Sequence, residues 1–193
     1  MRTGICRRET KETQVKVIVN LDTHEASKIN TGVGFFDHML TAFAFRAGIY
    51  LEIQAEGDLY VDDHHTVEDT GICLGRALAE ALGNKNGIAR YGTASIPMDE
   101  ALVHVTMDIS GRGLLVYNAK LPSQTVGGFE TELVEEFFRA LAHNTGITLH
   151  VNLAYGSNTH HIIEAMFKSL GVALAQTISQ TGSDIAPSTK GVL

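Results

Sequence analysis

The stretch HHTVE at residues 64–68 recurs as HHIIE at residues 160–164, so two histidines and a glutamate return 96 residues later in a chain of 193. The match continues into the residues that follow: Leu74, Gly75, Ala77 and Leu78 return as Leu170, Gly171, Ala173 and Leu174. Self-similarity at about half the chain length indicates a duplicated unit. The sequence therefore predicts two similar halves, residues 1–90 and 91–182, followed by a C-terminal arm at 183–193.

Apolar periodicity around the motif predicts the elements of each half. Alternating apolar residues predict strands at 15–21, 49–54, 101–108, 114–119 and 149–153. Apolar residues three or four apart predict helices at 35–46, 64–82, 132–143 and 160–181. Gly48 and Gly83 suit helix C-termini, and Asp63 and Thr159 suit the N-caps of the motif helices. Strands and helices do not strictly alternate, which favours an α+β fold of two duplicated halves, each a β-sheet backed by helices on one face.

Composition excludes several classes of protein. The net charge of −7 argues against non-specific nucleic-acid binding, which needs a basic surface. Cys6 and Cys73 form no CxxC motif, which argues against a disulfide scaffold or a thiolate zinc site and fits a reducing compartment. The start of the chain lacks the apolar core of a signal peptide, and no apolar run is long enough to span a membrane. We therefore expect a cytoplasmic protein with no nucleic-acid or membrane partner.

The HHxxE motif has a geometric consequence on a helix. Residues four apart share a face, so the first histidine and the glutamate of each motif can bind one cation together. The second histidine is turned away by about 100° and must serve a different ion. The economical arrangement is a crossed pair of sites: His64 and Glu68 with His161, and His160 and Glu164 with His65. The crossing can join the two motifs of one chain or of two chains.

The donor types narrow the choice of metal. Imidazole and carboxylate without thiolate suit Mn, Fe, Co, Ni or Zn, and several histidines with a glutamate favour an octahedral ion such as Mn²⁺. His38 could complete one set of ligands, and Glu136 lies at roughly the matching place in the second half. The alternative, that the histidine pairs are surface or capping residues, is disfavoured by two copies at a half-chain offset. The other histidines, at 24, 104, 143 and 150, follow no pattern and are expected to be structural.

The sequence indicates an anion-binding site less clearly than a metal site. The candidate residues are Arg90, Arg112, Lys168 and Lys190. Arg112 lies in the glycine-flanked turn at 110–113, where backbone N–H groups could face a phosphate. No P-loop, GxGxxG or GxSxG motif is present, so nucleotide binding and serine hydrolysis lack support.

Six segments together resemble one enzyme family. They are GVGFFDHML (32–40), DDHHTVEDTGICLG (62–75), SGRG (110–113), TLHV (148–151), NTHHIIEAMFK (158–168) and STKGVL (188–193). In these segments the chain resembles imidazoleglycerol-phosphate dehydratase of histidine biosynthesis, in its single-function form, over essentially its whole length. The resemblance implies dehydration of D-erythro-imidazole glycerol phosphate to imidazole acetol phosphate. It also implies a fold of the ribosomal protein S5 domain 2-like type, and trimers that assemble into a 24-subunit shell with active sites at subunit interfaces.

The resemblance also implies a role for each site residue. Two Mn²⁺ ions per active site would be bridged by the substrate imidazole. His38, His64, Glu68 and His161 would hold one ion, and His65, His160 and Glu164 the other. Some members have a histidine where this chain has Glu136, which could ligate in its place. The phosphate would be held by Arg90, Arg112, Lys168, Ser188 and Lys190, the last two from the C-terminal arm, and Glu12 would contact the substrate.

This constellation fits a difficult elimination, because the proton lost from the glycerol chain has no adjacent carbonyl. Metal ions on both ring nitrogens would favour an imidazolate that expels hydroxide through a diazafulvene-like intermediate. A base must then take the C–H proton. Glu164 or Glu68 is the hypothesis for that base, with Glu12 as a secondary candidate.

Two other classes of protein stay open. A dinuclear metallohydrolase such as a phosphatase would use paired metals, although such sites are richer in aspartate. A non-catalytic metal-binding or storage protein would have no need of a phosphate-binding cluster. Release of phosphate without an enolisable product would favour the first class, and substrate affinity that is insensitive to Arg112→Ala would favour the second.

Overall fold

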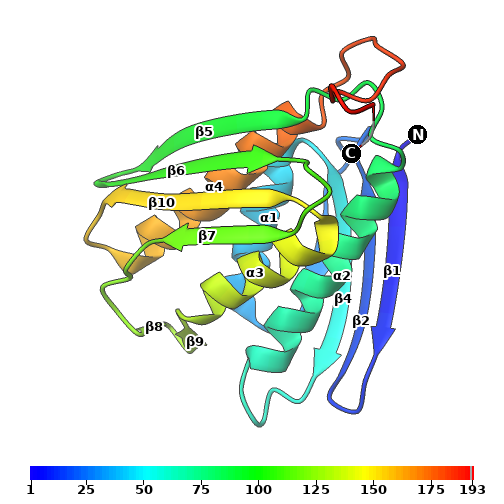
Figure 1. The fold of residues 1–193 in the computed structure, drawn as a ribbon. Coiled ribbons are helices and arrows are strands. Elements are labelled where there is room, and N and C mark those ends of the chain that lie inside the picture. Colours follow the sequence, from blue (N-terminus) through cyan, green and yellow to red (C-terminus); the bar gives the residue numbers. More distant parts are fainter. Residues whose placement is uncertain (192) are drawn as a thin grey trace.

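Two four-stranded sheets with the same strand order carry the two halves of the chain (Figure 1). The computed structural model describes residues 1–191 and 193, so residue 192 of the expected arm lies outside the described residues. The first sheet contains β1 (Thr3–Glu9), β2 (Thr13–Asn20), β4 (Tyr50–Gly57) and β3 (Lys28–Asn30), in that spatial order. The second contains β5 (Tyr91–Met98), β6 (Ala101–Asp108), β10 (Thr148–Tyr155) and β7 (Leu114–Asn118).

The pairing within the two sheets is also the same. Neighbouring strands are antiparallel, except that β3 runs parallel to β4 and β7 runs parallel to β10. Alternate residues of β2, Val15, Val17 and Val19, are buried, and Val103 and Val105 repeat this pattern in β6. One face of each sheet is therefore apolar and needs a cover.

Four long helices provide that cover and lie between the two sheets (Figure 1). They are α1 (Gly34–Ala47), α2 (His64–Leu82), α3 (Leu133–Thr145) and α4 (Thr159–Thr177). α2 packs on β1 and β2, and α4 packs on β5 and β6. The two helix layers meet through α1 against α4 and α2 against α3, so each contact joins one half to the other. The expected α+β fold of two halves, each with helices on one sheet face, is confirmed.

Two repeated glycines set how closely the helix layers approach. A Cβ atom on Gly75 of α2 would lie 2.9 Å from the carbonyl oxygen of Leu141 in α3. A Cβ atom on Gly171 of α4 would lie 2.5 Å from the carbonyl oxygen of Phe43 in α1. Real Cβ atoms rarely approach a backbone oxygen so closely, because interiors are already close-packed. The repeat keeps glycine at both positions because the helices touch there.

The C-cap of α1 is the expected glycine, whereas the N-caps of α2 and α4 differ from the expected ones. Gly48 adopts the left-handed conformation expected of a C-cap, with φ of 65°. Asp63 was expected to cap α2, but its side chain makes no cap hydrogen bond, and Asp62 Oδ1 accepts from the His64 N–H at 2.8 Å. The cap of α4 is Asn158 and not Thr159, because Thr159 lies inside the helix and its hydroxyl accepts from Ser123 instead.

The periodicity did not predict several of the strands. β1, β3 and β5 were not expected, and the hairpin of β8 (Thr125–Val126) and β9 (Phe129–Glu130) is an insertion found in the second half. The turn at 110–113 does connect β6 to β7, but these strands do not pair, because β10 lies between them. α4 ends at Thr177, four residues before its expected end. None of the described helices combines the length and the hydropathy that a membrane crossing requires.

Candidate metal and substrate site

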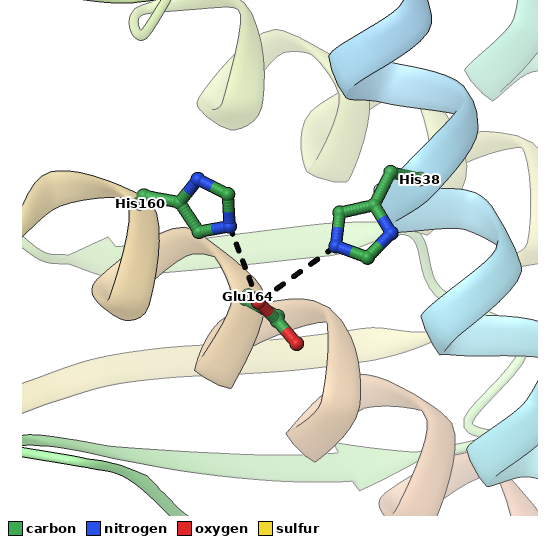
Figure 2. A group of neighbouring side chains, drawn as sticks. All are labelled: His38, His160 and Glu164. Carbon is green, nitrogen blue, oxygen red and sulfur yellow. Dashed lines mark ion pairs between the residues drawn. The ribbon is translucent and has the colours of Figure 1, made fainter.

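His38, His160 and Glu164 form a cluster whose ligand atoms all lie within 4.8 Å of one another. Figure 2 shows the Glu164 carboxylate between the two imidazoles, His38 on α1 and the other two residues on α4. The Glu164 Oε2 atom lies 3.3 Å from His160 Nε2 and 3.8 Å from His38 Nε2. Two imidazole nitrogens and a carboxylate oxygen facing one point are donors that suit a divalent transition metal ion.

Glu164 divides its two oxygens between different partners. Its Oε1 atom lies 2.6 Å from the Lys168 ammonium, one helical turn further along α4, and its Oε2 atom faces the histidines. Burial is the largest single influence and would raise the pKa of Glu164, but the hydrogen bond and charge of Lys168 together with His38 and His160 outweigh it, so this pKa lies below its usual value. The carboxylate is therefore held in the anionic form that binds a cation.

The first motif forms a looser pair on α2. His64 Nε2 lies 3.9 Å from Glu68 Oε2, and both side chains are more than 40% exposed. Both motifs therefore bring their first histidine and their glutamate to one helix face, as the spacing predicts. Glu12, on the turn between β1 and β2, lies 3.9 Å from His65 Nε2.

The second histidine of each motif contacts a carboxylate through Nδ1. His65 Nδ1 lies 3.1 Å from both carboxylate oxygens of Asp58, and His161 Nδ1 lies 2.7 Å from Glu100 Oε2. Asp58 raises the pKa of His65, and Glu100 raises the pKa of His161. The His161 partner lowers the pKa of Glu100 to about 2. No repeat or motif in the sequence marked Asp58 or Glu100.

The grouping of His38 corrects an expectation. The family resemblance placed His38 with His64 and Glu68, but the structure places it beside His160 and Glu164. The cause is helix packing, because α1 lies against α4 and not against α2.

The repeat supplies the counterpart of His38. Phe43 and Leu141, which face the two repeated glycines, lie 98 residues apart, and Glu136 lies 98 residues after His38. Glu136 is half-buried on α3, which packs on the motif helix α2, and its described partner is Arg139 at 3.6 Å.

Within the described residues, no ion pair links the first motif to the second. An open groove of about 540 Å³ does run past both motif helices, with His160 and Asp63 in its lining. The start of α1 and the β8–β9 hairpin form the rest of its wall. The groove adjoins the His38 cluster and gives a small molecule access to it.

The expected phosphate residues fall into two groups. Arg90 and Ser188 line one open groove of about 610 Å³ beside the C-terminal arm. Arg90 also pairs with Asp108 at 2.7 Å and donates to the Pro187 carbonyl at 2.9 Å.

The remaining cations lie at different ends of the second sheet. The turn that carries Arg112 adjoins the arm, since a Cβ on Gly111 would lie 3.1 Å from Leu193. Lys190 lies on the arm, with its N–H donated to Ser188 at 3.2 Å. Lys168 instead lies beside Glu164 and Met98, at the other end of β5, a strand that spans roughly 25 Å at about 3.3 Å per residue.

Comparison with known proteins identifies the family. A family model described as imidazoleglycerol-phosphate dehydratase matches residues 31–174. This chain belongs to the imidazoleglycerol-phosphate dehydratase family. The enzyme of that name from Exiguobacterium sp. is 53% identical over 99% of this chain and 98% of its own. The one from Methanosarcina barkeri is 53% identical over the whole of both chains.

Solved imidazoleglycerol-phosphate dehydratases share the fold. The crystal structure of the Staphylococcus aureus enzyme matches with a TM-score of 0.85 and 47% identity, over 93% of this chain and 99% of that one. The Pyrococcus furiosus enzyme, in complex with (S)-C348, matches with a TM-score of 0.85 and 41% identity, over 97% and 100%. Imidazoleglycerol-phosphate dehydratases are hydro-lyases, so the family places this chain among enzymes that remove water.

Proposed function

We propose that this chain dehydrates imidazole glycerol phosphate to imidazole acetol phosphate in histidine biosynthesis, with two Mn²⁺ ions per active site. The observation that carries the proposal is the cluster of His38, His160 and Glu164 in a member of this family. Its donors come from both halves of the chain, because α1 of the first half packs on α4 of the second. The substrate is a small phosphorylated imidazole, and the reaction takes place in the cytoplasm.

Each metal ion would be held by three ligands of one chain. The second histidine of a motif would complete its coordination. His38, His160 and Glu164 would hold one ion, and His64, Glu68 and Glu136 the other. His65 would complete the first and His161 the second, both from another copy of the chain. The lack of contact between the two motifs within the described residues supports this crossing between copies.

The separation of the cations supports the same arrangement for the phosphate. Lys168 lies beside Glu164, whereas Arg90, Arg112, Ser188 and Lys190 lie toward the C-terminal arm. One phosphate can meet both groups where two copies adjoin. We therefore propose trimers that assemble into a 24-subunit shell with active sites at the interfaces, and an arm at 183–193 that serves the phosphate after halves 1–90 and 91–182.

Bound Mn²⁺ would stabilise negative charge on both nitrogens of the substrate ring. The protein must then supply a base for the C–H proton. Glu164 has both oxygens engaged and Glu68 faces His64, whereas Glu12 lies beside His65 on an exposed turn. This geometry favours Glu12 over the two motif glutamates as the base.

The deciding experiment is incubation of the purified protein with imidazole glycerol phosphate, with Mn²⁺ and with a chelator in parallel. We expect a product that absorbs ultraviolet light after enolisation in alkali, formed with Mn²⁺ and not with the chelator. Release of inorganic phosphate without that product would make the protein a phosphatase instead.

A further inference from the structure

The second histidine of each motif contacts a carboxylate through its Nδ1 atom. Asp58 offers both carboxylate oxygens to His65 Nδ1 at 3.1 Å, and Glu100 offers one to His161 Nδ1 at 2.7 Å. The first histidines differ, because His160 and His64 face the glutamate of their own motif through Nε2. Only the second histidines therefore have an Nδ1 contact to a carboxylate among the described residues.

An ionised carboxylate can only accept a hydrogen bond, so Nδ1 of each second histidine carries the proton. The neutral ring then has its lone pair on Nε2, which is the atom that binds a metal ion. Both side chains are partly exposed, at 34% for His65 and 25% for His161. Their Nε2 atoms face exposed carboxylates, Glu12 at 3.9 Å from His65 and Asp99 at 3.7 Å from His161, so Nε2 lies on the solvent side of each ring. The carboxylate thus fixes both the tautomer and the direction of the free nitrogen.

Asp58 and Glu100 are not equivalent positions of the two repeats. Asp58 follows β4, and the equivalent position after β10, 98 residues later, holds Gly156. Glu100 precedes β6, and the equivalent position before β2, 88 residues earlier, holds Glu12, which faces Nε2 of His65 at 3.9 Å and not Nδ1. The same Nδ1 contact is therefore made by two positions that the repeat does not relate. A contact made twice by different routes indicates a shared requirement of the two rings.

Glu100 also holds the start of the motif helix. Its Oε1 atom accepts from the backbone N–H of Asn158 at 2.7 Å and of Ser157 at 3.1 Å, while Oε2 faces His161. One side chain therefore fixes both the first turn of α4 and the ring that the turn carries.

We propose that Asp58 and Glu100 are positioning residues that hold His65 and His161 with Nδ1 protonated and Nε2 presented to a metal ion. This inference rests on the proposed function, since it needs those histidines to be ligands. Carboxylates in this place typically change metal affinity by 10-fold to 100-fold. A merely structural ion pair would change thermal stability and leave metal affinity alone.

The test measures bound manganese and not activity. Wild-type holoprotein, Asp58→Asn and Glu100→Gln are equilibrated against manganese–chelator buffers, and retained manganese is determined by elemental analysis. We expect the midpoint for loss of metal to rise about 10-fold to 100-fold in free Mn²⁺ for each variant. Asp22→Asn, which removes a carboxylate that pairs with Arg2, is the matched control and should retain metal as the wild type does.

A double substitution shows whether the acid acts through its histidine. In a His65→Ala background, Asp58→Asn should cause no additional loss of manganese, because the ring that it orients is gone. If Glu100→Gln fails to fold because the helix start is lost, Asp58→Asn decides alone, since the described hydrogen bonds of its side chain are those to His65.

The outcomes separate this inference from the proposed function. A wild-type protein that retains no manganese overturns both. A wild type that retains manganese, with variants within twofold of its midpoint, overturns the positioning role and leaves the proposed function standing.

Discussion

The Glu164 carboxylate contacts His38 and His160 with one oxygen and the Lys168 ammonium with the other. Its substitution by glutamine removes the negative charge from the cluster, so we expect Glu164→Gln to lose manganese together with turnover. Glu12→Gln should retain both metal ions and lose about 10²-fold to 10⁴-fold in kcat with little change in KM, because the lost group is a base. Metal analysis alongside steady-state kinetics distinguishes the loss of metal in Glu164→Gln from the loss of a base in Glu12→Gln. A Glu164→Gln protein with both metals and full turnover would remove that residue from the site.

Cys73 allows a prediction that is independent of the metal. Burial, aided by the neighbouring Cys6, raises the pKa of Cys73 to about 12. Roughly one thiol in 10⁴ is then ionised at pH 8, and the thiolate is the reactive form. In the native protein we expect Cys73 to resist Ellman's reagent at pH 8 over hours. After unfolding in guanidinium chloride both cysteines should react, and fast reaction of two thiols in the native protein would contradict the buried position.

At the residue scale, the sequence predicted which side chains of one helix face each other, but not which side chains of different helices meet. The spacing within HHxxE was sufficient for the pairs His64–Glu68 and His160–Glu164, because a helix places residues four apart on one face. The partner of His38 depends on which helix α1 packs against, and no local pattern encodes that. Asp58 and Glu100 lie in loops, where period and spacing carry no signal.

At the scale of the elements, the close contact between helices at the repeated glycines can be tested by substitution. In Gly171→Ala the new methyl group meets a backbone oxygen of α1, which cannot move away as a side chain could. We expect a loss of about 1–3 kcal/mol in the free energy of unfolding. At about 2–4 °C per kcal/mol for a chain of this size, calorimetry should show a Tm lower by several degrees.

Gly34 provides the control for that substitution. It lies at the start of α1, and nothing approaches within 4 Å of the position a Cβ would take. Gly34→Ala should therefore leave the Tm unchanged or slightly raise it, because alanine favours a helix. Equal Tm values for both variants would show that the helices do not touch at Gly171.

Element boundaries were harder to predict than elements. The duplicated helices and central strands follow from periodicity, whereas β1 and β3 lie near the edges of a sheet with fewer apolar residues to mark them. The N-cap of α4 is Asn158 and not the expected Thr159, because tertiary contacts bury Thr159 within the first turn of the helix.

At the scale of the whole molecule, metal and assembly should depend on each other. If His65 and His161 bind ions held by another copy, each ion joins two chains and stabilises the contact. We expect exhaustive chelation to dissociate the large particle into smaller oligomers, and added Mn²⁺ to restore it. Sedimentation velocity measures this directly. An unchanged sedimentation profile in metal-free buffer would place all ligands of each ion within one chain.

The contacts between the helix layers also carry a record of ancestry. In the present chain, the first helix of each half packs on the second helix of the other, and Phe43 faces Gly171 as Leu141 faces Gly75. This reciprocity is the pattern of an isologous twofold interface. A half-length ancestor would therefore have been a homodimer with two identical half-sites, which gene fusion made into one polypeptide. Once fused, the two copies could change separately. His38 and Glu136, which occupy equivalent positions in the two halves but differ in residue type, are an example of such a change.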